Sequence, residues 1–226
     1  IHASFQLSVS VLTLLSGHAI GSKKSHAKLL RLTTGFVSGA TVMTALLLSF
    51  TCFVLLSIFQ SSIPLLAWAV VCGLLIGLGI AVWSFYYRRE QGTTLWLPRG
   101  FASYLSDRTK ATKHSTEAFS LGLTSVLAEI LFILAPVLVS AFVIIQLSPV
   151  LQLIGVAIYT LISLLSLLIV AGLIGSGHKL SQIQKWRETN KRFLQFTAGS
   201  GLLVLGFYVY VDQVVAVTAA LAYGGY

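Results

Sequence analysis

Six long apolar stretches, separated by polar loops, constrain this chain more than any other feature of its sequence. A helix of about 20 apolar residues crosses the hydrocarbon core of a bilayer. The stretches run from Ala3 to Ile20, Leu32 to Ile58, Pro64 to Tyr87, Ala118 to Gln146, Val150 to Ile174, and Phe193 to about Ala216. Only 9% of the 226 residues are charged, whereas soluble domains average about 25%. We therefore predict an all-α, polytopic membrane bundle of six transmembrane helices.

The basic residues predict how this bundle is oriented. The 15 lysines and arginines all fall in three loops, as Lys23, Lys24, Lys28, Arg31; Arg88, Arg89, Arg99, Arg108, Lys110, Lys113; and Lys179, Lys185, Arg187, Lys191, Arg192. The positive-inside rule places these loops in the cytoplasm and both termini outside the plasma membrane. The net charge of +9 belongs to these loops, so we expect anionic headgroups at the inner face, and no nucleic acid, as partners.

The predicted helices divide the chain into three parts. Residues 1–87 form a first three-helix repeat, residues 88–117 a basic cytoplasmic loop, and residues 118–226 a second three-helix repeat. Within the loop, the segment from Trp96 to Thr112 puts Phe101, Tyr104 and Leu105 on one face and basic residues on the other. This pattern is typical of a short helix on the membrane surface, and Pro98 suits its first turn.

Two pairs of similar strings indicate an internal repeat. Cys72-Gly73-Leu74-Leu75-Ile76-Gly77 in the third stretch resembles Ser200-Gly201-Leu202-Leu203-Val204-Leu205-Gly206 in the sixth, and Ser4-Phe5-Gln6-Leu7 in the first resembles Ala118-Phe119-Ser120-Leu121 in the fourth. Both pairs are three helices apart. An odd number of spans per repeat inverts the second copy, which is common in transporters.

With these strings, the chain resembles the superfamily of LysE-type exporters and CcdA/DsbD-type thiol–disulfide carriers. The resemblance implies two inverted three-helix repeats with helices one and four at the centre. The CcdA branch carries one redox cysteine in each of those helices, whereas Cys52 and Cys72 lie here in helices two and three. The thiol-redox function is therefore disfavoured.

Glu129 is the residue that most indicates a function. It lies about eleven residues, or about 16 Å, into the fourth stretch, near the middle of a bilayer. A charge at that depth costs about 2.5–3.5 kcal/mol and normally faces a cavity or the bundle interior. Ser125 and Pro136 share its stripe, and Pro136 predicts a kink because it has no N–H to donate. The alternative is a structural acid that bonds to a neighbouring helix.

Helix one carries a similar polar stripe of Gln6, Ser10 and Thr13. These side chains avoid lipid, so we expect them to meet the stripe of helix four and to bind a small solute or a cation with it. The alternative is that each hydroxyl bonds to its own backbone.

Two pairs of glycines have the GxxxG spacing that lets membrane helices approach closely. Gly35 and Gly39 lie in helix two, and Gly73 and Gly77 lie in helix three. We predict that both pairs pack against other helices.

No motif predicts an enzyme, a cofactor or a metal site. The sequence contains no GxSxG or P-loop, and its histidines lack the HxxxH and HExxH spacings. Two functions stay open: a secondary transporter or exporter of a small solute or ion, with Glu129 at its centre, and an accessory membrane subunit that transports nothing. Association with a second copy, or with a membrane complex, stays open as well.

Overall fold

The structure is a computed structural model. It describes Val9, residues 11–13, Leu15, residues 26–60, residues 62–85, Leu105, residues 107–176, Gln182, Lys185, Trp186 and residues 189–223. Most of the predicted first helix, and of the loop at residues 86–104, lies outside these residues.

The described residues are helical and match five of the predicted apolar stretches. The elements are α2 (His26–Phe59), α3 (Leu65–Phe85), α5 (Ser115–Ala128), α6 (Ile130–Ile144), α7 (Pro149–Ser163), α8 (Leu165–Gly175), α10 (Lys191–Tyr210), the π-helix η1 (Val211–Val215) and α11 (Ala216–Tyr223). By length and composition, three continuous helices can cross a membrane: α2, α3 and the run from Arg192 to Ala222. The bent pairs α5–α6 and α7–α8 raise this number to five if each pair is one span. This arrangement indicates a multi-pass membrane protein.

The two bent pairs correct the sequence-based expectation. The fourth and fifth stretches were predicted as continuous helices, but α5 and α6 meet at a bend of 78° and α7 and α8 at a bend of 54°. Hydropathy could not show this, because the stretches stay apolar across both breaks.

Local sequence accounts for several helix ends. Gln60, with a φ of 55°, ends α2 in the left-handed conformation that often terminates helices. Pro149 occupies the first turn of α7, where its missing N–H costs nothing. The carboxylate of Glu117 accepts hydrogen bonds from the backbone N–H groups of Lys113 (2.7 Å) and His114 (3.2 Å), and so fixes the start of α5.

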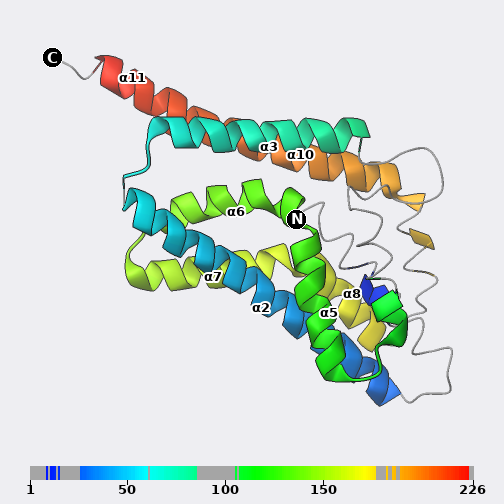
Figure 1. Cartoon of the computed structure of the whole chain (residues 1–226). Helices are drawn as coiled ribbons and strands as arrows, with labels where there is room; N and C mark the ends of the chain where they lie inside the picture. The colour runs from blue at the N-terminus through cyan, green and yellow to red at the C-terminus, as the bar shows by residue number, and fades with distance from the viewer. Residues whose placement is uncertain are drawn as a thin grey trace.

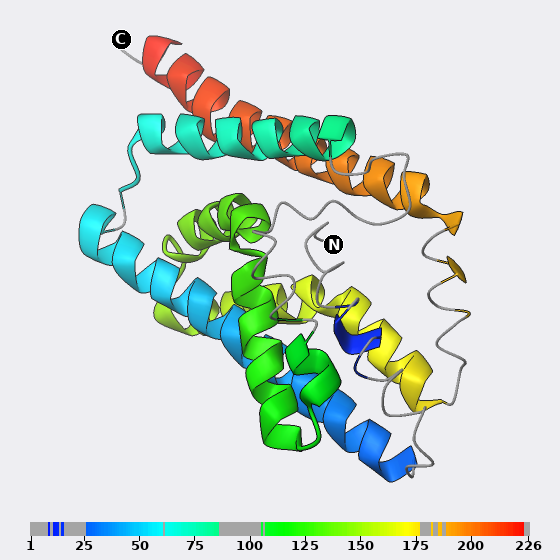
Figure 2. The same ribbon diagram turned by 45° about the vertical axis from the view of Figure 1, so that its right-hand side comes forward.

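Two groups of helices make up the bundle (Figure 1). In one, α3 and α10 lie side by side and antiparallel, with α11 continuing from α10. In the other, α2 contacts α5, α6, α7 and α8. The turned view shows α5 crossing α2 (Figure 2). Contacts between α3 and α6 join the groups, including Trp68 and Phe142, whose rings meet edge to face at 5.0 Å.

The pairing of α3 with α10 is fixed at one end by polar contacts. The side-chain amide of Gln195 donates to the carbonyls of Val82 (2.8 Å) and Trp83 (2.7 Å). The indole of Trp83 donates to the carbonyl of Phe196 (3.2 Å) and stacks on its ring, with centroids 5.7 Å apart. These interactions satisfy carbonyls at the end of α3 and make α3 and α10 one rigid pair.

Candidate functional site

Glu129 is the residue at which α5 ends and α6 begins. Its φ and ψ are −91° and 6°, and its N–H donates to the carbonyl of Val126, three residues back rather than four. This backbone region is sparsely populated and recurs at functional sites. The side chain is only 2% exposed. The chain therefore breaks a helix at its most deeply placed acid.

A second break has the same backbone conformation. Leu164, between α7 and α8, has a φ of −87° and a ψ of 1°. Ser163 ends α7 just before this break and is 2% exposed. Two apolar segments are thus interrupted by one residue each, at Glu129 and at Leu164.

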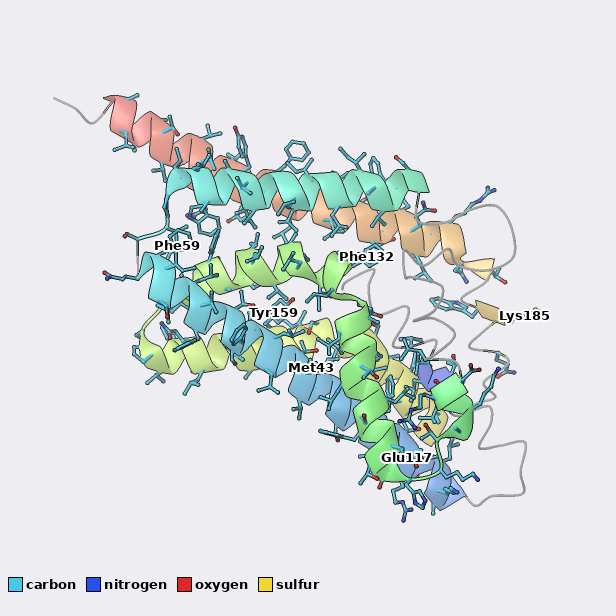
Figure 3. All side chains as sticks on the ribbon, viewed as in Figure 1. Met43, Phe59, Glu117, Phe132, Tyr159 and Lys185 are labelled. Carbon is cyan, nitrogen blue, oxygen red and sulfur yellow. The ribbon has the colours of Figure 1, made fainter. Side chains whose placement is uncertain are left out.

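The two breaks border one small cavity. Its lining is Thr44, Leu47, Val126, Glu129, Ile133, Val137, Tyr159 and Ser163, so α2, α5, α6 and α7 all contribute. The volume open to the centre of a water-sized sphere is about 10 Å³, which is about the space of one water molecule. Figure 3 shows Tyr159 in the interior of the bundle, between the ribbons of α6 and α7.

Three polar residues of this lining were not predicted from the sequence: Thr44, Tyr159 and Ser163. Tyr159 and Ser163 are four residues apart, so they share one face of α7. A search for polar pairs at helical spacing in the fifth stretch would have found them. No comparable signal marked Thr44, since α2 contains several threonines.

The predicted partners of Glu129 in helix four lie elsewhere. Ser125 is fully buried, and its hydroxyl donates to the carbonyl of Gly122 at 2.8 Å. Pro136 is buried within α6, which continues through it. Neither residue lines the cavity. The kink predicted at Pro136 is therefore a break at Glu129, seven residues earlier.

The polar stripe of helix one is described only in part. Thr13 is 2% exposed. Gln6 and Ser10 lie outside the described residues. The predicted meeting of the stripes of helices one and four therefore stays a prediction.

The two glycine pairs have different surroundings. A Cβ on Gly35 would lie 2.7 Å from the carbonyl oxygen of Ser115, and one on Gly39 would collide with that of Phe119. Gly122 of α5 faces the carbonyl of Phe36 equally closely, so the crossing of α2 and α5 depends on these glycines. Gly73 and Gly77, in contrast, have nothing within 4 Å. Their predicted packing role is not seen within this chain; on α3, Gly79 faces α10 instead.

A wider groove lies at the start of α5. Its volume is about 330 Å³ by the same measure, and its lining is Arg108, Ala111, Thr112, Thr116, Glu117, Ser120, Leu121 and Thr124. Thr116, Ser120 and Thr124 follow each other at steps of four, so they form a hydroxyl stripe that ends five residues before Glu129. The backbone N–H groups of Lys113 and His114 lower the pKa of Glu117, the acid of this groove. Figure 3 shows Glu117 well apart from Tyr159.

Metal and thiol chemistry find little support among the described residues. They contain no group of three His, Cys, Asp or Glu side chains placed to hold a metal ion. Cys52 and Cys72 are both free and buried.

The chain matches no protein-family model, no curated protein and no solved structure. Its relation to the inverted-repeat carriers therefore stays a prediction from the sequence.

Proposed function

We propose that this chain is a secondary transporter of a small polar solute that works by alternating access. It would span the plasma membrane with its basic loops in the cytoplasm and both termini outside. The observation that carries the proposal is the meeting of two broken helices, α5–α6 and α7–α8, at one cavity that contains a buried acid.

Broken helices are costly in a membrane. Backbone groups at membrane depth must bond within the protein or face a cavity, because lipid offers no hydrogen bonds. Transporters accept this cost because the broken ends form binding sites near the midplane. A bundle that served only as a structural subunit has no comparable reason to break two adjacent segments beside a glutamate.

The groove beside α5 suits the solute. Sites for small organic molecules start at about 300 Å³, and the groove has a volume of about 330 Å³. Arg108 and Glu117 offer both charge signs, and the hydroxyl stripe offers hydrogen bonds. We therefore expect a small polar solute, such as an amino acid or another zwitterion, rather than an apolar one.

The two groups of helices supply the moving parts. The rigid α3–α10 pair would rock against the group around α2, which holds both breaks. The inverted repeat predicts that α3 and α10 are equivalent, and Gly73 and its predicted counterpart Gly201 both have open space around them. This shared feature supports the proposal.

A stability screen followed by a flux assay tests the proposed function. The detergent-purified chain is screened by thermal unfolding against amino acids, amines and organic acids, because ligands of the folded state raise its stability. Each compound that stabilises the chain is then followed, radiolabelled, into proteoliposomes. We expect saturable uptake that falls about tenfold or more in Glu129→Gln.

Asp107→Asn is the matched control. Asp107 is an exposed acid with a 3.9 Å ion pair to Lys110, and it lines neither cavity. Its uptake should equal that of the wild type. If no compound enters the vesicles faster than into protein-free ones, the accessory-subunit function replaces the transporter.

A further inference from the structure

We infer that the cavity beside Glu129 binds one small monovalent cation, with Na⁺ as the ion that fits it. The inference rests on the proposed function only for the role of the ion, which would be to couple transport. Binding itself follows from the size, the lining and the charge of the cavity.

Size excludes an organic ligand. The cavity offers about 10 Å³ to the centre of a water-sized sphere, whereas sites for organic ligands are about 30 times larger or more. An amine or an amino acid does not fit without a large rearrangement. A water molecule or a desolvated ion of similar size does.

The hydroxyls of the lining present lone pairs to the cavity. Thr44 donates its proton to the carbonyl of Ala40 (2.8 Å), and Ser163 donates to that of Thr160 (3.1 Å). A hydroxyl has a single proton, so each oxygen keeps only acceptor capacity for other groups. Tyr159 and Glu129 add further oxygens. A set of oxygen ligands suits a hard cation.

Charge selects a monovalent ion. Glu129 is the only charged residue of the lining, Tyr159 is its only other titratable one, and Leu47, Val126, Ile133 and Val137 make up the rest. A buried carboxylate in such surroundings needs a compensating charge. One positive charge neutralises it, whereas a divalent ion would leave an excess charge among apolar side chains.

The helix ends add to this preference. Both α5 and α7 end at the cavity, and the C-terminus of a helix attracts cations. The segment α6 begins beside Glu129, and the N-terminus of a helix stabilises a carboxylate. The breaks therefore favour an ionised Glu129 with a cation beside it.

Thermal unfolding of the purified full chain in NaCl, KCl and choline chloride at equal ionic strength tests the inference. At about pH 8 we expect a saturable rise in Tm with Na⁺ and little with choline. Glu129→Gln should abolish the rise, while Thr44→Val and Ser163→Ala should each weaken the apparent Na⁺ affinity about tenfold. At about pH 5, protons should compete for Glu129 and weaken Na⁺ binding.

Thr41→Val is the matched control, because Thr41 bonds to the carbonyl of Val37 in the same way but does not line the cavity. It should keep the full response to Na⁺. The inference is overturned if Tm is indifferent to Na⁺, if choline acts as well as Na⁺, or if only pH matters, which would assign a proton to the site. Should Glu129→Gln fail to fold, the two hydroxyl variants still decide.

These outcomes separate the inference from the proposed function. Na⁺ that stabilises the chain, without solute flux in vesicles, keeps the ion site and removes the transporter. Solute flux without any Na⁺ effect on stability or rate keeps the transporter and removes the ion site.

Discussion

Single glycines decide how closely α2 and α5 approach. A Cβ at position 39 would collide with the backbone carbonyl of Phe119, which no side-chain rotation relieves. A Cβ at position 73 meets open space. The same residue type in the same spacing therefore has two different energetic roles.

This difference predicts opposite effects of two identical substitutions. Gly39→Ala should lower the free energy of unfolding by about 1–3 kcal/mol, because the helices must separate. Gly73→Ala should leave it unchanged or raise it by about 0.5–1 kcal/mol, because alanine favours helix. Denaturant unfolding in detergent measures both, and equal effects would contradict the crossing described here.

Glu117 predicts a pH-dependent helix start. Its pKa lies below the ordinary value of 4.5, mainly because the backbone N–H groups of Lys113 and His114 bond to the ionised form. A lowered pKa in the folded state means that the stabilisation is complete above about pH 4.5 and is lost as the pH falls through the lower, folded value.

Glu117→Ala should therefore lower Tm slightly at neutral pH, and the difference from the wild type should shrink in acid. Because the carboxylate is fully exposed, solvent screening keeps the effect small. Glu117→Gln serves as the control that keeps an acceptor oxygen without the charge. A penalty that is the same at neutral and acidic pH would show that charge plays no part.

At the scale of elements, the break at Glu129 shapes the bundle. It turns α6 away from α5 by 78°, so that α5 crosses α2 while α6 runs between α7 and the α3–α10 pair. Pro136 lies inside α6 without ending it. Its missing N–H weakens α6 locally but does not set the direction of the chain.

Pro136→Ala should therefore leave the bend in place. With spin labels at the exposed positions Thr116 and Val143, a bend of 78° gives a separation of about 31 Å, and a straight helix gives about 40 Å. Pulsed electron spin resonance on the variant should return the shorter distance. A shift toward the longer one would restore Pro136 as the cause of the bend.

At the scale of the whole molecule, the helix ends divide into two sets (Figure 1). The turns at residues 60–64 and 145–148 lie toward one end of the bundle, and neither carries a charge. The ends of α3 and α8 and the start of α10 lie toward the other end, where the basic loops connect. This separation is what an oriented membrane protein needs.

Single cysteines report the orientation directly. In a variant with Cys52 and Cys72 replaced by alanine, Lys110→Cys should react with an impermeant thiol reagent only in inside-out vesicles. Ser148→Cys should react only in right-side-out vesicles or intact cells. The reverse pattern would invert the orientation that the basic loops predict.

The sequence was sufficient to predict the class of protein and the position of five helices within a few residues. Hydropathy reports the solvent, and here the solvent is lipid. It was also sufficient to identify Glu129, because a carboxylate is costly at that depth wherever its neighbours lie. The oriented charge pattern follows from the sequence for the same reason, since it depends on loops and not on contacts.

The site required the tertiary structure. Thr44, Tyr159 and Ser163 come from α2 and α7, and their meeting with Glu129 depends on how those helices pack. Nor could the sequence tell Gly39 from Gly73, because a neighbouring helix and a lipid tail are both apolar and leave the same pattern. The break at Glu129 rather than at Pro136 is likewise a result of packing, since the local rule for proline favoured the other position. Local chemistry set the elements, and contacts between distant segments made the cavity.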